Sequence, residues 1–118
     1  MGVFSVTVEI GDPQGEHFQA VEALVDSGAS YTSAPRSLLR SLGVAPQERR
    51  PFILADGRTV EHDMGQTWVR VDGRVRMTPV VFADEGTRPL LGAVTLEEFG
   101  LGIDPVGRQL IPVPGYLM

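Results

Sequence analysis

The sequence predicts an all-β protein, folded as a closed or strongly curled β-barrel with one or two short helices. Fourteen glycines and nine prolines in 118 residues indicate frequent turns, which favour short strands over a helix bundle. Two Asp-Gly pairs, Asp56-Gly57 and Asp72-Gly73, lie between apolar segments, and this pattern is typical of tight β-hairpins. At this length we expect a single domain, residues 1–118, with one modest core.

The N-terminal half is expected to begin with a hairpin. Residues 3–10 alternate apolar and polar side chains, as a half-buried strand does, and residues 11–15 have the composition of a turn. Residues 18–25 form the returning strand. A short helix is then expected to begin at Ser33-Ala34-Pro35, run through Leu42 and end at Gly43.

The C-terminal half is expected to continue as a meander of short strands. The strands are residues 52–55, 59–61, 66–71, 74–82, 101–104 and 109–113. Residues 84–88 have loop composition, and residues 89–92 form a short buried segment. Residues 95–99 are expected to form one short helix that stops at Gly100. The sum is about eight strands.

Composition excludes several classes of function. The net charge is −5, and the largest basic cluster is the pair Arg49-Arg50, so no nucleic-acid partner is expected. The absence of cysteine excludes disulfides, thiolate nucleophiles and Cys-ligated zinc. No apolar run is long enough to span a bilayer, and residues 1–6 lack the pattern of a signal peptide. We therefore expect a cytoplasmic protein with no membrane-spanning segment and no membrane partner.

The stretch that carries the chemistry is residues 23–30, Ala-Leu-Val-Asp-Ser-Gly-Ala-Ser. Three apolar residues lead directly into Asp26, which places a carboxyl at the edge of a core, where hydrogen bonds must compensate for ionisation. Gly28 allows a sharp turn and the close approach of another group. An Asp-Ser-Gly turn alone is common in proteins, so its interpretation depends on the rest of the chain.

Three motifs occur in this chain in the same order in which a known protein family has them. They are Leu24 to Ser30, the hairpin around Ala55-Asp56-Gly57-Arg58, and Leu90-Leu91-Gly92 followed by a short helix and Gly100 to Pro105. Together they resemble the retroviral-type, retropepsin-like aspartic protease family, and its stand-alone bacterial members more than its viral ones. The resemblance covers residues 3–113. It implies the family's single-domain acid protease fold and an aspartic endopeptidase that hydrolyses peptide bonds.

That resemblance also implies the site. Asp26 is the expected catalytic residue, and no metal or other cofactor is implied. The remaining expected site residues are the active-site loop Ser27, Gly28, Ala29 and Ser30, the flap Ala55, Asp56 and Gly57, and the support Leu90, Leu91 and Gly92. The family's chemistry needs two carboxyls that share one proton. Because the chain has one Asp-Ser-Gly, the second carboxyl is expected from Asp26 of an identical chain in a C2 homodimer. The substrate is expected to be an extended peptide or protein.

Other readings of the sequence stay open or are disfavoured. A retropepsin-like domain could serve as a dimerisation or peptide-binding module with little or no proteolysis. A serine protease is disfavoured because the chain is too short and His17 lies in an early turn. A metal site from His62-Asp63 with His17 or Glu61 is disfavoured because neighbouring residues on a strand point to opposite faces. Trp68 is expected to be a packing residue.

Three features depart from the family pattern. The segment after Gly92 reads Ala93-Val94-Thr95-Leu96, where many bacterial relatives have a more acidic or aromatic opening. Ser27 stands where threonine is commoner in the family. Pro112 and Pro114 lie in the C-terminal segment Pro112-Val113-Pro114-Gly115, where proline removes hydrogen-bond donors from a strand. We therefore expect any terminal sheet that joins two copies to be short or altered.

Overall fold

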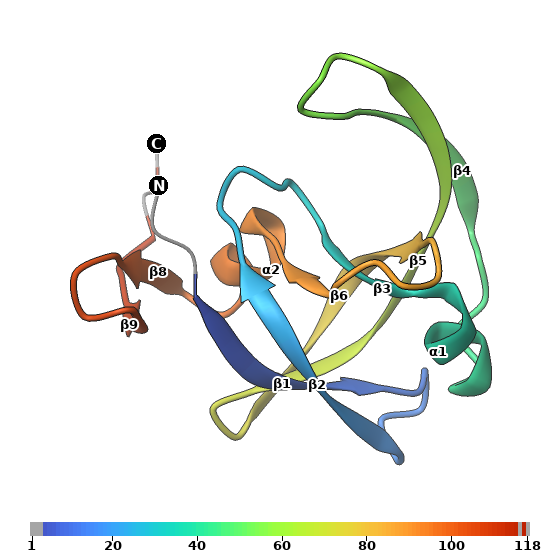
Figure 1. Cartoon of the computed structure of the whole chain (residues 1–118). Coiled ribbons are helices and arrows are strands. Elements are labelled where there is room, and N and C mark those ends of the chain that lie inside the picture. The colour runs from blue at the N-terminus through green and yellow to red at the C-terminus, as the bar shows by residue number, and fades with distance from the viewer. Residues whose placement is uncertain (1–3, 116, 118) are drawn as a thin grey trace.

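The computed structural model describes residues 4–115 and 117, and in these residues it contains nine strands and two short helices (Figure 1). The strands are β1 (Ser5–Gly11), β2 (Phe18–Val25), β3 (Thr32–Pro35), β4 (Glu48–Ile53), β5 (Thr59–Val71), β6 (Arg74–Ala83), β7 (Leu90–Leu91), β8 (Leu101–Asp104) and β9 (Gln109–Pro112). The helices are α1 (Arg36–Ser41) and α2 (Ala93–Glu98). The predicted fold class, all-β with short helices, is confirmed.

Seven strands form one sheet that closes on itself. Its order is β1-β2-β7-β3-β6-β5-β4, and an additional pairing of β1 with β5 makes a ring of the first six. Strand β4 lies outside this ring and pairs only with β5, so the two form an arm that arches away from the barrel (Figure 1). The predicted curled barrel is therefore a closed one, and closure leaves few free strand edges.

The β1–β2 hairpin follows the sequence pattern closely. Strand β2 has the predicted bounds, and the alternation in β1 buries Val8 and Ile10, each with 1% of its surface exposed. Val3, the first residue of the predicted strand, lies outside the described residues. Since β2 runs straight from the hairpin into Asp26, this part of the chain places the candidate catalytic residue.

The segment after the Asp26 loop differs from the prediction. Residues Ser33 and Ala34, expected at the start of a helix, belong to β3, which pairs in parallel with Val80–Ala83 of β6. Helix α1 begins only after Pro35 and ends at Ser41, one residue before the predicted Leu42, which caps it ahead of Gly43 with φ +81°. The strand was missed because four residues with small or polar side chains carry no apolar alternation, while distant partners bury them.

Strand β5 is longer than predicted. Residues 59–61 and 66–71 were expected as two strands, but one strand runs through both. The interruption suggested by Gly65 marks close packing instead, because a Cβ there would lie 2.6 Å from the carbonyl oxygen of Ala45. Strand β4 likewise begins at Glu48, four residues before the prediction.

Both Asp-Gly pairs lie in hairpins, as predicted, but their turns differ. Asp72 and Gly73 both have positive φ, 51° and 77°, and form a two-residue turn between β5 and β6. At the other pair, Leu54 accepts the N–H of Gly57 and donates its own N–H to the carbonyl of Arg58. The arm therefore ends in a three-residue loop with Gly57 at φ 88°.

The core lies inside the ring and beneath α2. Its largest fully buried side chains include Phe99, Ile10, Leu39 and Leu91. Helix α2 begins two residues earlier than predicted and ends before Gly100. Strands β8 and β9 form a separate two-stranded hairpin beside the barrel (Figure 1). No helix in the residues that the structure describes has the length and apolar character of a membrane span.

Candidate active site

Asp26 lies at the end of β2, where the buried strand reaches the surface. Its N–H donates to the carbonyl of Leu91 at 3.1 Å, and its carbonyl accepts the N–H of Ala29 at 3.1 Å. Its carboxylate oxygen Oδ1 accepts the N–H of Gly28 at 2.9 Å. The residue is half-buried, so one carboxylate oxygen is oriented by the backbone while the carboxyl remains open to a ligand.

Gly28 fits beside the carboxyl because it has no side chain. A Cβ at this position would lie 3.1 Å from Oδ1 of Asp26, closer than ordinary carbon–oxygen contact. The neighbouring Ser27 and Ser30 are exposed, and Ala29 is half-buried. Asp26 and the four residues of the predicted active-site loop thus lie in one turn, closed by the hydrogen bonds from Gly28 and Ala29 to Asp26.

The segment Leu90-Leu91-Gly92 supports this loop from the barrel side. Strand β7 is inserted between β2, which it joins in parallel, and β3, which it joins antiparallel. Just after it, the N–H groups of Ala93 and Val94 donate to the carbonyls of Ala29 and Ser30 at 2.9 and 3.0 Å. The start of α2 therefore holds the loop through its backbone.

Gly92 makes this close docking possible. A Cβ there would lie 2.4 Å from the carbonyl carbon of Tyr31 and 2.9 Å from the nitrogen of Thr32, both backbone atoms. Contacts this short do not occur between non-bonded atoms, so a residue with a side chain requires movement of α2 or of the loop. The predicted supporting residues and the predicted active-site loop are brought together at this point.

The predicted flap is the exposed tip of the β4–β5 arm, Ala55-Asp56-Gly57. Asp56 accepts the N–H of Arg58 at 3.0 Å and pairs with its guanidinium at 2.7 Å. These hydrogen bonds to Arg58, the backbone one first, lower the pKa of Asp56 below its ordinary value. An ionised Asp56 therefore stabilises the turn at the tip.

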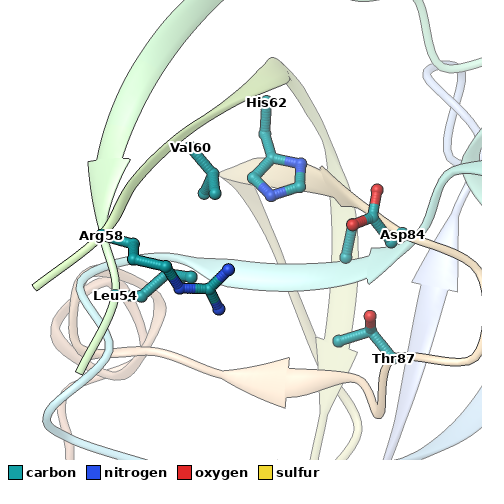
Figure 2. Close-up of a pocket in the computed structure, with 7 residues that line it drawn as sticks. Leu54, Arg58, Val60, His62, Asp84 and Thr87 are labelled. Carbon is teal, nitrogen blue, oxygen red and sulfur yellow. The ribbon is translucent and has the colours of Figure 1, made fainter. Parts of the chain in front are cut away.

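A pocket of about 290 Å³ lies beneath the arm. Figure 2 shows Leu54, Arg58, Val60 and His62 on the side of the arm, facing Asp84 and Thr87 across the pocket. Asp84 and Thr87 belong to the predicted loop 84–88, which leads into Pro89 and β7. The pocket therefore lies between the arm and the loop that leads into β7, and a concave space of this kind can hold part of an extended ligand.

Three residues that the sequence did not reveal connect the arm to the Asp26 loop. Tyr31 follows that loop, and its hydroxyl accepts a hydrogen bond from Arg50 of β4 at 3.2 Å. The Arg50 guanidinium also lies 5.3 Å from the centre of the Tyr31 ring, and Phe52 meets the same ring edge-on at 6.3 Å. The hydrogen bond to Tyr31 raises the pKa of Arg50, which therefore stays charged. In the structure Arg50 and Phe52 are half-buried while their neighbours in β4 are exposed, but no pattern in the sequence marked this face of the strand.

A second, mainly apolar groove of about 360 Å³ begins at Ser27. It runs between α2 and β8 and is lined by Ser27, Ala93, Leu96, Glu97, Leu101, Gly102 and Ile103. The groove thus adjoins the Asp26 loop at Ser27. Strand β8 pairs with β9 of its own chain, with Leu101 opposite Pro112.

The metal site considered from the sequence is not assembled. His62 packs against Phe52, with ring centres 6.1 Å apart, while Asp63 pairs with Arg49 at 3.3 Å. His17 lies instead with Asp12 and Glu16, the one group of three possible metal ligands found in residues 4–115 and 117. Trp68 is a packing residue whose indole N–H donates to the carbonyl of Pro13 at 3.0 Å.

The closed six-strand ring, in which β7 and the start of α2 hold the Asp26 loop, is the arrangement of a retropepsin-like aspartic peptidase, a class of hydrolase. Residues 6–95 match the family described as aspartyl protease. Since this match spans more than half of the chain, the protein belongs to the aspartyl protease family.

Solved structures show the same fold at low sequence identity. The simian foamy virus (mac) protease is 21% identical, with a TM-score of 0.57 over 80% of this chain and 92% of the viral one. The EIAV protease complexed with the inhibitor HBY-793 is 19% identical, with a TM-score of 0.60 over 82% and 88% of the two chains. A comparison with curated proteins found no match.

Proposed function

We propose that this protein is an aspartic endopeptidase whose active site is completed by a second copy of the chain, so that two Asp26 carboxyls form the catalytic dyad. The observation that carries the proposal is the position of Asp26 in a chain of the aspartyl protease family. Its carboxyl is oriented by the Gly28 N–H and is only half-buried, so a ligand can reach it. The chain offers one Asp-Ser-Gly, so the dyad needs two chains.

The proposed reaction divides the work between the two carboxyls. Because two carboxylates in hydrogen-bond contact cannot both ionise, the pair shares one proton. The ionised carboxylate takes a proton from a water molecule, whose oxygen attacks the carbonyl carbon of the scissile peptide bond. The protonated carboxyl donates its proton to the carbonyl oxygen. In the tetrahedral intermediate the nitrogen then accepts a proton from the carboxyl that took it from water, and the C–N bond breaks. One hydroxyl of the intermediate returns its proton to the other carboxylate, which gives a carboxylic acid and an amine and restores the shared proton.

The arm and the pocket beneath it would bind the substrate. An extended peptide would lie between the tip Ala55-Asp56-Gly57 and the Asp26 loop, held mainly by main-chain hydrogen bonds. Closure of the tip would exclude water other than the attacking molecule. The contact of Arg50 and Phe52 with Tyr31 supports this role, because it fixes the base of the arm to the residue that follows the loop.

The groove that begins at Ser27 is the surface we assign to the second copy. For two Asp26 carboxyls to come into hydrogen-bond contact, the two-fold axis must pass beside Asp26, which would bring the adjacent Ser27, and with it the start of this groove, close to the second copy. Burial of this groove supplies apolar contact that the single chain leaves unused.

Hydrolysis of a fluorogenic peptide library tests the catalytic part. We expect the wild type to cleave, with a rate that falls at both acidic and alkaline pH because one shared proton is required. Asp26→Asn should abolish cleavage. The matched control is Asp72→Asn, the same change in an exposed two-residue turn that also accommodates asparagine. Equal cleavage by wild type and Asp26→Asn, or no cleavage by either, contradicts the proposal that Asp26 catalyses peptide hydrolysis and favours a binding module.

Cross-linking tests the dimer. The chain has no cysteine, so Ser27→Cys provides a single thiol beside the proposed axis. We expect it to form an intermolecular disulfide rapidly under mild oxidation, since a disulfide requires Cα atoms within about 7 Å. The control is Val106→Cys, a 92% exposed position in the β8–β9 turn outside the groove. Equal rates for both variants, together with a monomer mass by light scattering, contradict the proposed dimer.

A further inference from the structure

Three threonine hydroxyls form a connected network beneath the Asp26 loop. Thr32 begins β3, Thr78 lies in β6 and Thr95 lies in α2, and each has 1% or less of its surface exposed. The Thr32 hydroxyl donates to Oγ1 of Thr95 at 2.6 Å. The hydroxyl oxygens of Thr95 and Thr78 lie 2.8 Å apart. The three side chains thus link a strand, a second strand and a helix at one buried point.

A hydrophobic core does not require these hydroxyls. Valine has nearly the same shape as threonine and fills such positions without a polar atom. A buried hydroxyl is destabilising unless it is hydrogen-bonded, so the network brings a requirement for defined relative positions of its three elements. Hydrogen bonds have narrow distance and angle ranges, whereas apolar contacts tolerate sliding. The network therefore determines where α2 sits more sharply than apolar packing does.

The network continues to the backbone of the active site. The Thr32 hydroxyl oxygen accepts the N–H of Gly92 at 3.1 Å. The residue before Gly92 is Leu91, whose carbonyl accepts the Asp26 N–H, and the residue after it is Ala93, whose N–H donates to the Ala29 carbonyl. One hydrogen bond on each side of Gly92 therefore holds one end of the turn that presents the Asp26 carboxyl.

We propose that Thr95, with Thr32 and Thr78, is a positioning residue for catalysis, which holds the first turn of α2 where it fixes the Asp26 carboxyl. This inference rests on the proposed function. It assigns to the network a role beyond stability, because the carboxyl must meet a second carboxyl and a substrate carbonyl at defined distances. A displacement of about 1 Å at a reacting group can lower a rate about 100-fold.

The test compares two valine variants of equally buried threonines. Thr95→Val removes the central hydroxyl of the network. Thr67→Val is the control, because Thr67 is also fully buried, donates its hydroxyl to the Gly11 carbonyl and lies on β5 outside the active-site support. We expect both variants to be less stable, but only Thr95→Val to lower kcat, by about 10- to 100-fold, with KM changed less than about threefold. Thr95→Ser, which keeps the hydroxyl, should recover most of the wild-type kcat.

A second readout does not depend on activity. Amide hydrogen exchange measured by NMR should show that the Asp26 N–H, bonded to the Leu91 carbonyl, exchanges faster in Thr95→Val than in Thr67→Val. Should Thr95→Val fail to fold, Thr78→Val removes the neighbouring hydroxyl and is expected to have the same two effects.

The outcomes separate the two proposals. If kcat and Asp26 exchange change equally in the Thr67 and Thr95 variants, or change in neither, the positioning role is wrong. If the wild type shows no Asp26-dependent cleavage, the proposed function fails. In that case, faster Asp26 exchange in Thr95→Val alone would still support the network as the support of this loop.

Discussion

Gly92→Ala tests whether the docking of α2 against the Asp26 loop is as tight as the distances indicate. The new Cβ would lie 2.4 Å from the Tyr31 carbonyl carbon and 2.6 Å from its oxygen. Relief to ordinary contact requires a shift of about 1 Å. Such a shift would lengthen the bonds from Gly92 to Thr32 and from Ala93 to Ala29, now 3.1 and 2.9 Å, beyond hydrogen-bonding distance.

The expected loss of stability follows from these terms. Overpacking of a buried site destabilises by about 1–3 kcal/mol, and each lost hydrogen bond by about 0.5–1.5 kcal/mol, so we expect Gly92→Ala to lower the free energy of unfolding by about 2–6 kcal/mol. The total is a large fraction of a small domain's stability. Equilibrium unfolding in urea measures it directly.

The control for this experiment is Gly115→Ala. A Cβ at Gly115 meets nothing within 4 Å, so the substitution should leave the free energy of unfolding within about 1 kcal/mol of wild type. A Gly92→Ala protein whose stability also lies within about 1 kcal/mol of wild type would refute the reasoning, because it would mean that the loop and α2 separate without loss.

Three further expectations concern the core, the surface and the arm. Leu39→Ala creates a cavity beside α1, where the Leu39 side chain of that helix is fully buried, and should lower the free energy of unfolding by about 2–5 kcal/mol in urea denaturation. The Ser37 hydroxyl and N–H lower the pKa of Glu85, so its contribution to stability is present above its unfolded pKa and is lost as the pH falls through its folded pKa. The difference in melting temperature between wild type and Glu85→Gln should therefore shrink from neutral to acidic pH; a constant difference would contradict this. Tyr31→Phe removes the hydroxyl that accepts from Arg50, and trypsin should then cut the arm at Arg58 several times faster, as judged by mass spectrometry, whereas an unchanged rate would show that the contact does not restrain the arm.

Features with strong local signals could be predicted from the sequence. The first hairpin follows from apolar alternation and turn residues, and the second Asp-Gly pair adopts the two-residue turn that its residues favour. The apolar strand that delivers Asp26 was also visible, because burial of Val25 and exposure of Ser27 follow from residue type.

Features that depend on distant partners could not be predicted. Strand β3 has no apolar pattern, and it exists because β6 and β7 flank it. Gly65 interrupts the pattern of β5 but not the strand, because its missing side chain lets Ala45 approach. The same applies to the site: Tyr31 and Arg50 are 19 residues apart. Side-chain contacts at such separations leave no periodic trace in a single sequence.

The pairing of β8 with β9 within one chain separates the formation of this hairpin from the association of two chains. Because the last described strand returns onto its own polypeptide, the hairpin finishes without help from another molecule. Formation of this hairpin is then a first-order process, while any association of two chains is a second-order one. If the proposed dyad takes one Asp26 from each of two chains, activity per chain would fall on dilution while this hairpin kept its pairing.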